Sequence, residues 1–577
     1  MPEGWGRLFR SAARMRWRTR LSTRAEFSAR GRFVVSLAPR TTRSRTPSRE
    51  PFQEGSIGME SPTTGSARPG AVSELLDFLR RYSREQLDSR RMDERRGFHL
   101  SLIPDLAQAG LFGLQVPKRY RGQELPHSDT IKVWRQAGAI DCNLLILLAV
   151  HNTLGVPPVQ HFAREEVRAA VLPELAQGRR LVTSAVSEPS MGSNVRAITS
   201  TATKRPDGSY VINGGKQWIS LGNDAHHVNL FARLTDENGQ DAGITGFLVD
   251  TSTPGFVRGP EVVTLGLKAV PQNSLSLENL HVPAESLLGE EGKGLVAAKT
   301  AFTQGRLMLA TGALGAAMRA LEMTQRFARR REVATGNLAE NGRIQQIIAE
   351  SVAATQAVEM LVEHIADRLD SGREVPEPFY FAAKILGCEL MWQVVDRCVQ
   401  LLGARGFVDT NVVGQFYRDY RLFRIFEGTT EAITVYLGSM VLKQPQQFLS
   451  IFDEFDLDPA LAEYVDRVDK LTTTTTTGGQ QRHILAGQIG ELACWAILSA
   501  LTAEGRTRSS MHAHTASWSE QQLAGKLRSA EESRPFVELP TADELARHIG
   551  DFESSIGNVE QRRPGIQHDL DLLLRRG

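Results

Sequence analysis

Residues 424–431 read Arg-Ile-Phe-Glu-Gly-Thr-Thr-Glu, and they place one carboxylate, Glu427, in an apolar run that ends at a Gly-Thr pair. A carboxylate that loses its hydration in apolar surroundings has a raised pKa, which suits a base that removes a weakly acidic proton from carbon. Glu427 is therefore a candidate general base. A lone Phe-Glu-Gly would more simply be a surface glutamate, so the segments before it decide between the two interpretations.

Two earlier segments complete the pattern. Residues 186–194 read Val-Ser-Glu-Pro-Ser-Met-Gly-Ser-Asn, and residues 213–220 read Asn-Gly-Gly-Lys-Gln-Trp-Ile-Ser. In this order the three segments resemble the acyl-CoA dehydrogenase family, which has a Thr-Glu-Pro-x-x-Gly-Ser-Asp loop, an Asn-Gly-x-Lys-x-Trp-Ile-Thr/Ser strand and a Tyr/Phe-Glu-Gly-Thr segment. The resemblance covers about residues 100–441, and the layout is most similar to the very-long-chain branch, which carries a C-terminal extension.

Composition indicates a multidomain globular protein. The 577 residues are 41% hydrophobic and 23% charged, so the chain can bury a large core. The four cysteines are widely spaced and form no C-x-x-C pair, which suggests neither a disulfide framework nor a zinc site and fits a reducing compartment. The most apolar segment, residues 484–501, contains Glu491, so a membrane span is not expected.

The N-terminal segment has an unusual charge. Residues 1–58 hold thirteen arginines, no lysine and four acidic residues. An arginine- and serine-rich, acid-poor leader is typical of an organellar transit peptide, and a start codon assigned too early, with Met59 as the true start, explains it equally well. Arginine without a folded recognition module does not indicate nucleic-acid binding.

The hydrophobic period changes twice along the chain. It is helical from residue 71 to about 178, alternates in short runs between turn signals from 181 to about 288, and is helical again from 292 to about 441. Six threonines at 472–477 form a low-complexity linker, and residues beyond 480 return to a helical pattern. In that pattern one broad apolar face must be buried, either on the rest of the protein or on a membrane or partner.

These patterns predict an α+β protein with a helical N-terminal domain, a middle β-domain that is an antiparallel sheet or barrel, a helical C-terminal domain and an extra helical extension. The resemblance implies that the C-terminal domain is a four-helix bundle. The predicted limits are 1–70 for the disordered leader, 71–180, 181–290 and 291–445 for the three domains, and 446–577 for the extension.

The resemblance implies FAD-dependent removal of two hydrogens from an acyl-CoA, or from an acyl carrier thioester, to give the trans-2-enoyl product. No side chain accepts hydride reversibly, so a redox cofactor is required. Electrons would pass to an electron-transferring flavoprotein. Two alternatives stay open: an oxygen-using acyl-CoA oxidase, and a non-catalytic scaffold on the same fold, since a fold does not fix function.

Site residues follow from the matching motif positions. The base is Glu427. The FAD contacts implied by the resemblance are Ser184, Val186, Ser187, Ser193, Trp218, Ile219, Ser220, Arg331, Gln345, Gln400, Gly403, Thr429 and Glu431. The substrate contacts so implied are Ser193, Arg306 and Gly428.

The sequence departs from the family pattern at several points. Some members place the base directly before the arginine that matches Arg306, but Gly305 stands there, which leaves Glu427 as the only candidate. Asn194 replaces an aspartate, Ala334 and Thr335 stand where Phe-Gly is usual, and Ala404 replaces a glycine. These changes put the adenine-side contacts in doubt. No metal site is expected, because the pair His226 and His227 lacks further ligands at metal spacing.

The resemblance also implies a homodimer whose subunits share the FAD sites, and a peripheral membrane contact through the extension is a further expectation. The location would be the mitochondrial matrix or inner-membrane face if the leader is a transit peptide, and the cytoplasm if the start is mis-assigned.

Overall fold

The computed structural model describes residues 70–236, 238–455, 461, 463, 464, 467, 479–532, 540–551 and 555. All of them belong to one compact unit, Ala67–Gly577. The predicted leader, apart from Gly70, and the threonine linker at 472–477 lie outside the described residues.

The N-terminal part is helical, as predicted. Apolar side chains at helical spacing, such as Leu75, Leu79 and Tyr82 on the first helix, are buried in the main core. The elements are α1 (Ala71–Glu85), α2 (Ser89–Arg95), α3 (Leu102–Gln108), η1 (Lys118–Tyr120), α4 (His127–Ile140), α5 (Cys142–Ala149), a π-helical turn η2 (Val150–Gly155), α6 (Val156–Phe162) and α7 (Glu165–Ala176). The sequence did not signal the π-helical turn, which interrupts an otherwise regular apolar pattern.

The middle part is one eight-stranded sheet with the order β6-β7-β3-β2-β4-β5-β8, to which β1 adds beside β4. The strands are β1 (Val182–Ala185), β2 (Thr201–Lys204), β3 (Tyr210–Ser220), β4 (His227–Thr235), β5 (Asp241–Asp250), β6 (Phe256–Glu261), β7 (Gln272–Val282) and β8 (Leu287–Leu288). The predicted antiparallel pairing holds except at β4, which runs parallel to β1 and β2. The chain forms the antiparallel hairpin of β2 and β3 and then returns to the other side of β2, so β4 runs in the same direction as β2.

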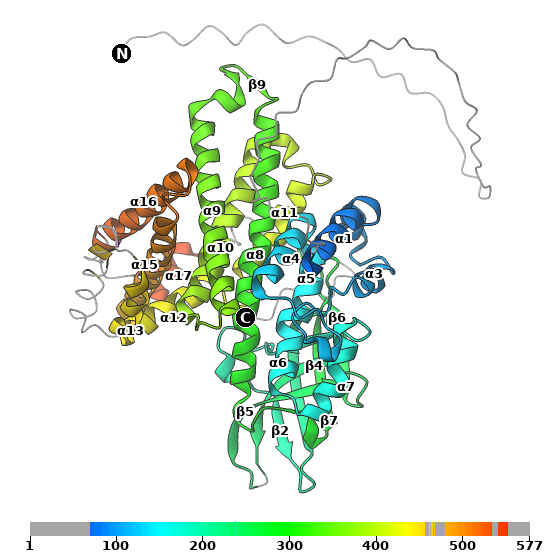
Figure 1. The fold of residues 1–577 in the computed structure, drawn as a ribbon. Helices are drawn as coiled ribbons and strands as arrows, with labels where there is room; N and C mark the ends of the chain where they lie inside the picture. The colour runs from blue at the N-terminus through cyan, green and yellow to red at the C-terminus, as the bar shows by residue number, and fades with distance from the viewer. Residues whose placement is uncertain are drawn as a thin grey trace, which may run out of the picture. The chain divides into compact units, whose positions relative to one another are not determined.

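A helical bundle follows. Its elements are α8 (Gly294–Ala328), the short pair β9 (Glu332–Val333) and β10 (Gly336–Asn337), η5 (Leu338–Glu340), α9 (Gly342–Asp370), α10 (Glu377–Leu402), η6 (Gly403–Arg405), α11 (Val412–Arg421), η7 (Leu422–Arg424) and α12 (Thr430–Lys443). Helices α8, α9 and α10 lie side by side, with the turn at β9 at one end (Figure 1). The predicted order of a helical domain, a β-domain and a second helical domain is therefore confirmed.

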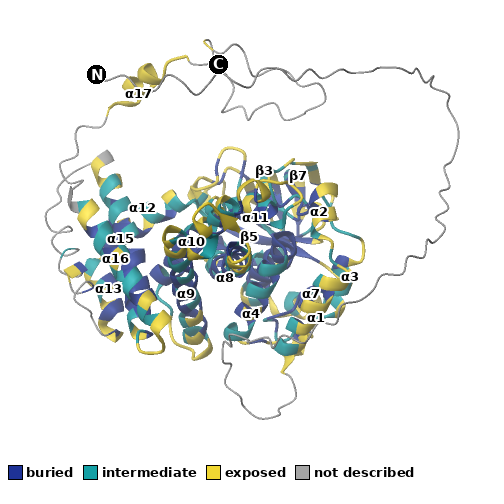
Figure 2. Ribbon diagram, turned by 90° about the horizontal axis from the view of Figure 1, so that it is seen from above, coloured by how far each residue is buried: buried dark blue, intermediate teal, exposed yellow. Residues whose placement is uncertain are grey.

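Alanine and glycine allow α8 to pack closely on its neighbours. A Cβ atom on Gly138 of α4 would overlap the Gly312 carbonyl of α8, and one on Gly315 of α8 would overlap the Arg135 carbonyl of α4. Side chains in this part of the bundle are largely buried (Figure 2). Backbone contact at this crossing fixes the position of α8, which matters because α8 also borders Glu427.

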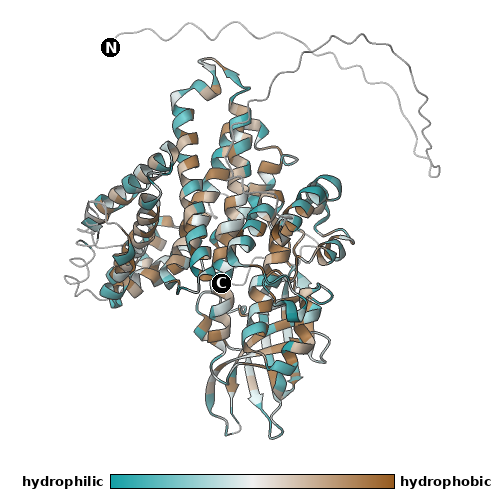
Figure 3. Cartoon of the chain, viewed as in Figure 1, coloured by the Kyte–Doolittle hydropathy of each residue, from teal (hydrophilic) through white to brown (hydrophobic). Residues whose placement is uncertain are grey.

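The extension begins with α13 (Pro445–Leu449) and η8 (Ser450–Glu454) and continues with α15 (Gln480–Glu504), α16 (Ser510–Glu532) and the short α17 (Ala542–Ile549). Helix α15 contacts α12, α10 and α9, and its predicted apolar face, including Ile489, Leu492 and Ile497, is buried there. Much of α15 is hydrophobic (Figure 3).

Two helical segments, Cys142–Phe162 and Gln481–Glu504, are long and apolar enough to cross a membrane. Their apolar windows are 94% and 72% buried inside the structure, which is what core helices show.

The crossing of α12 and α15 depends on two glycines, Gly438 of α12 and Gly490 of α15. A Cβ on Gly490 would overlap the Thr434 carbonyl, whereas one on Gly487 of the same helix would make only an ordinary contact, 3.7 Å from a Val435 methyl. We expect Gly490→Ala to lower the free energy of unfolding by about 1–3 kcal/mol through overpacking. Gly487→Ala should be neutral or stabilising by up to about 1 kcal/mol, because alanine favours the helix. Urea unfolding of both variants checks this, and equal effects would contradict a steric role for Gly490.

Candidate active site

The Glu427 turn joins η7 to α12. Glu427 and Gly428 both have left-handed backbone conformations, with φ of 55° and 93°. For a non-glycine residue this conformation costs roughly 1–3 kcal/mol and persists only where the surroundings impose it. A Cβ on Gly428 would overlap the Ile433 side chain, so the second position requires glycine.

The Glu427 carboxylate is shielded although the residue as a whole is only half-buried. Its Oε2 atom has almost no contact with solvent and no hydrogen-bond partner among the described residues. Burial raises the pKa of Glu427 to about 7, while the nearby positive charges of Arg306 and Lys384 act in the opposite direction. The prediction of a base with a near-neutral pKa therefore has geometric support.

Helix α8 places a glycine, Gly305, in front of this carboxylate. A Cβ on Gly305 would lie 3.7 Å from Glu427 Oε2 and 3.2 Å from a Leu154 methyl. The two positions at which the resembling family places its base, here Gly305 and Glu427, therefore lie next to each other. The next residue, Arg306, has a buried Nε without a partner, and its guanidinium carbon lies 4.5 Å from the centre of the Phe381 ring. Burial lowers the pKa of Arg306.

Helix α10 holds the Glu427 turn with two charged side chains that sequence reasoning missed. Lys384, fully buried, donates to the Gly428 carbonyl at 2.5 Å. Glu389 accepts a hydrogen bond from the Thr430 hydroxyl at 2.7 Å and forms an ion pair with Arg424, also at 2.7 Å. The signal was present in the sequence, because Lys384 interrupts an apolar run and a buried lysine needs a partner.

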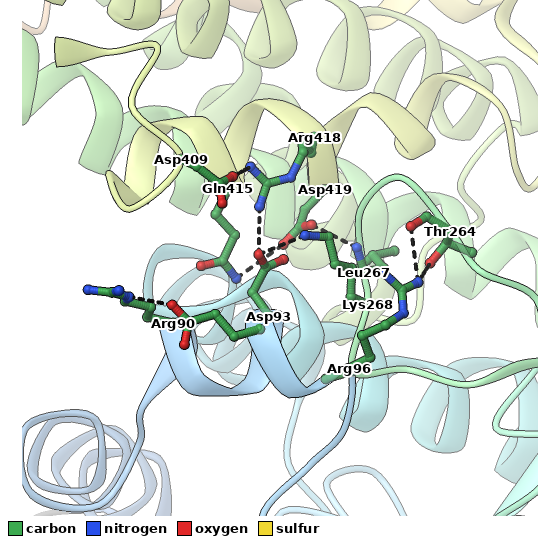
Figure 4. Close-up of polar contacts among 12 residues, drawn as sticks. Arg90, Asp93, Arg96, Thr264, Leu267, Lys268, Asp409, Gln415, Arg418 and Asp419 are labelled. Carbon is green, nitrogen blue, oxygen red and sulfur yellow. Dashed lines mark hydrogen bonds and ion pairs between the residues drawn. The ribbon is translucent and has the colours of Figure 1, made fainter. Parts of the chain in front are cut away.

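A polar cluster fixes α11, which leads directly to the Glu427 turn (Figure 4). Arg418 and Lys268 both bind the Asp93 carboxylate, at 2.7 and 2.9 Å. The neighbouring Asp419 accepts from the backbone of Leu267 at 2.7 Å. The cluster thus ties α11 to α2 and to the loop between β6 and β7.

A buried ion pair organises the predicted flavin loop. Lys216 on β3 donates to Glu188 and to the Phe231 carbonyl, each at 2.7 Å, and both side chains of the pair are shielded from solvent. The other Glu188 oxygen accepts from the backbone and hydroxyl of Thr199. Burial alone would raise the pKa of Glu188, but these donors lower it to about 2. Both residues lay within the motifs, yet the sequence had suggested no role for them.

Trp218 projects from the same strand. Its φ is 62°, and the pairing of β3 with β7 shifts register between Lys216 and Ile219. Ile219 after this bulge is buried, whereas Trp218 is 52% exposed. A large aromatic surface is therefore presented outward on strained backbone.

The predicted flavin-side residues lie on β1, on the loop after it and on β3, and their hydroxyl groups differ in whether they form hydrogen bonds. The backbone of Gln217 donates to the Ser187 carbonyl at 3.0 Å, which places the loop along β3. Within the described part of the chain the hydroxyl groups of Ser184, Ser187 and Ser193 form no hydrogen bond. The Ser220 hydroxyl, in contrast, already exchanges hydrogen bonds with Gln272 at 3.1 and 2.8 Å.

A short chain of contacts links this loop to the base. Ser184 of β1 pairs with Asn229 of β4, and the Asn229 amide donates to the carbonyls of Leu154 and Gly155 at 3.2 and 2.7 Å. The Leu154 side chain in turn borders Gly305 and thus the Glu427 carboxylate. The π-helical turn therefore lies between the two halves of the site.

Most of the predicted adenine-side residues lie away from Glu427, at the other end of the bundle. About 35 Å of helix separates Gly305 from the C-terminal end of α8 at Ala328. Arg331 follows that end and therefore lies far from Glu427. Gln345 at the start of α9 and Gln400 and Gly403 at the end of α10 lie towards the same end of the bundle. Thr429 caps α12 through its hydroxyl, and Glu431 is exposed in the first turn. One chain thus does not bring all of the predicted contacts together.

A cavity of about 430 Å³ adjoins α8 but is not lined by Glu427. Its lining includes Thr300, Thr303, Gln304 and Leu307, whose spacing defines a stripe on the side of α8 away from Gly305.

The histidine pair His226 and His227 lies at the start of β4. Among the described residues no three His, Cys, Asp or Glu side chains gather at metal distances. His226 instead accepts from the Leu181 backbone at 3.1 Å.

Comparison with known proteins identifies the class. Profiles of the N-terminal, middle and C-terminal domains of acyl-CoA dehydrogenases match residues 72–179, 183–280 and 292–438. The chain belongs to the acyl-CoA dehydrogenase family.

Three relatives illustrate the range. An acyl-CoA dehydrogenase of Bacillus subtilis is 30% identical over 351 residues, which are 61% of this chain and 92% of that protein. The mitochondrial very long-chain specific acyl-CoA dehydrogenase of Bos taurus is 29% identical over 64% of this chain, which spans only 57% of that protein's length. An acyl-CoA dehydrogenase of Bacillus anthracis, solved in complex with FAD, has a TM-score of 0.69 and 22% identity, covering 83% of this chain and 89% of its own. This last likeness concerns the fold alone, and it extends beyond the three family domains.

The buried carboxylate makes stability depend on pH. The pKa of Glu427 is about 7 in the folded protein and 4.5 in its ordinary state, so the folded state binds more protons between these values. Stability from this group is therefore present at low pH and lost as pH rises through about 7, by about 3 kcal/mol at most. We expect Glu427→Gln to gain stability over the native protein as pH rises from 5 to 8, measured by urea unfolding. Glu322→Gln, at an exposed site on α8, should not change the pH slope, and an unchanged slope for both variants would contradict the burial argument.

Proposed function

We propose that this protein is an acyl-CoA dehydrogenase in activity as well as in family, converting a saturated acyl thioester to the trans-2-enoyl thioester. The observation that carries this proposal is the shielded Glu427 oxygen, which has no hydrogen-bond partner among the described residues and faces Gly305, a position without a side chain. A carboxylate with a pKa near 7 is matched to accepting an α-proton at neutral pH. Arg306 and Lys384 would stabilise the carboxylate before it takes the proton.

The residues present fit FAD as the cofactor. The half-exposed indole of Trp218 offers a flat surface for a ring system. Ser187, whose carbonyl accepts from the backbone of the adjacent Gln217, has an unengaged hydroxyl that can donate a hydrogen bond. FAD would supply the hydride acceptor that side chains lack. Val186 and Ile219 would contribute backbone groups, while Ser220 would have to exchange its Gln272 partner to contact the ring.

The substrate class follows from the same site. An acyl chain would lie along the face of α8 that carries Gly305, beside Leu154, and Ser193, Arg306 and Gly428 are the proposed thioester and CoA contacts. The chemistry is the same for a CoA and a carrier-protein thioester, and a panel of both types of substrate would identify which one is used.

The direct test is anaerobic spectroscopy. The purified protein should be yellow and should bleach when a suitable acyl-CoA is added. Glu427→Gln should retain the flavin but bleach about 10²- to 10⁴-fold more slowly, because the general base is lost. Native protein that holds flavin and is not bleached by any acyl thioester would favour a scaffold, and stoichiometric hydrogen peroxide in air would favour an oxidase.

We further propose that two copies share each FAD site. The distance along α8 between Gly305 and Arg331 supports this, because four of the adenine-side residues lie at the far end of the bundle from Glu427 of the same chain: Arg331, Gln345, Gln400 and Gly403. Arg331, Gln345, Gln400 and Gly403 would then serve a flavin bound mainly by the partner, whereas Thr429 and Glu431 directly follow Glu427 of the same chain. A homodimer is the smallest assembly that satisfies this arrangement.

Mixed dimers test the sharing. We expect Arg331→Ala to bind FAD weakly and Glu427→Gln to lack activity, whereas coexpression of the two should restore activity. In the mixed dimer one site combines an intact Glu427 with an intact Arg331 from the other subunit. Flavin-reduction assays of affinity-purified mixed dimers give the result, and activity no higher than in the parent variants would show that each chain holds its own FAD.

The remaining assignments follow the resemblance. An electron-transferring flavoprotein is the proposed electron acceptor, and the extension is the proposed site of any peripheral membrane contact. The bovine relative is mitochondrial by its name; for this chain we propose the mitochondrion if the leader is cleaved as a transit peptide, and the cytoplasm otherwise.

A further inference from the structure

Lys384 is a fully buried lysine within the helical bundle. It lies in the apolar part of α10, between Phe381 and Leu386, with no exposed surface. Burying an ammonium group is costly unless charge or hydrogen bonds compensate for it. Within the described chain Lys384 forms no ion pair, and its hydrogen bond to the Gly428 carbonyl at 2.5 Å is the contact that the structure shows.

That carbonyl belongs to the residue after the base. Glu427 and Gly428 occupy successive left-handed conformations, so the turn depends on its surroundings to keep the carboxylate aimed at Gly305. Lys384 fixes the middle of the turn, and Glu389 fixes its exit through the Thr430 hydroxyl. Both side chains project from α10, a rigid helix packed along α8.

The charged groups around the carboxylate come from three helices. Arg306 of α8 and Lys384 of α10 are the cations that act on Glu427. Glu427, Glu389 and Cys388 act in turn on Lys384, and Glu377 at the start of α10 and Tyr436 of α12 act on Arg306. Lys384 is thus one of only two described positive charges that oppose the desolvation of the base.

We propose that Lys384 is a positioning residue for Glu427, which both holds the turn by its carbonyl and stabilises the ionised carboxylate before catalysis. This inference rests on the proposed function, since it assigns Lys384 to the same proton-transfer step. Lys384 does not touch the substrate. It acts through Glu427, so its loss should affect the rate of proton removal and its pH dependence more than the binding of substrate.

Two substitutions separate the two effects. Lys384→Met removes both charge and donor, whereas Lys384→Gln removes the charge but keeps a donor on a side chain one bond shorter. In both variants the acidic limb of flavin reduction against pH should move up by about one pH unit, because an opposing charge is gone. The maximal rate should fall at least tenfold more in Lys384→Met than in Lys384→Gln, with KM changed little.

Glu389→Gln is the matched control. It weakens the other attachment of the turn on the same helix but leaves both cations beside Glu427. Its acidic limb should stay where it is, even if the rate falls. An acidic limb that moves equally in Glu389→Gln, or that stays fixed in both Lys384 variants, would overturn the charge role.

A double-mutant cycle supplies a readout without turnover. Urea unfolding at pH 8 should show that Lys384→Met lowers the midpoint more when Glu427 is present than when it is Gln, because the two side chains are coupled. Additive effects in the cycle would refute the coupling even if the protein proves active. If the native protein reduces no flavin with any thioester, the proposed reaction fails, and the cycle still decides whether Lys384 positions Glu427.

Discussion

The exclusion of water from one carboxylate is the constraint around which the catalytic half of this protein is arranged. Glu427 is useful as a base only if its pKa is near neutrality, and that requires apolar walls on several sides. The glycine at 305 lets α8 approach, while α10 closes another side and brings a buried lysine to the turn. The same burial is unfavourable for folding, so the surrounding helices must be held firmly enough to impose it. Close backbone contacts between α4 and α8 provide that rigidity.

Buried charge is handled in a different way in the β-domain. Lys216 and Glu188 neutralise each other, and backbone and hydroxyl donors satisfy the remaining lone pairs of the carboxylate. Such a fully satisfied pair adds little net stability but specifies a single arrangement of the loop on β3. With the loop fixed, the bulge that follows can turn Trp218 outward. The Glu427 oxygen is thus left without a partner among the described residues, whereas the Glu188–Lys216 pair that holds the loop is fully hydrogen-bonded.

The extension continues the same framework. Helix α15 crosses α12 through Gly438 and Gly490, where the two backbones meet. Since α12 begins three residues after Glu427, the extension packs directly on the helix that follows the base. Its apolar face, which in isolation could have met a lipid surface, is buried against α12, α9 and α10. A large part of the extension therefore belongs to the fold of the protein rather than to a detachable tail.

The sequence by itself determined the order of helix, sheet and helix, because hydrophobic period is a local property. It also singled out Glu427 as the candidate base, because three motifs occurred in the family's order. It could also place Ser187 and Trp218 in one loop-and-strand unit. Only the tertiary structure revealed what Lys384 and Glu389 hold, because their partners lie 44 and 41 residues away in the sequence. It alone showed that Ser220 is engaged by Gln272 and that Arg331 lies far along α8 from the base. The physical reason is that the cost of a buried charge and the reach of a side chain depend on neighbours distant in sequence, which no local pattern records.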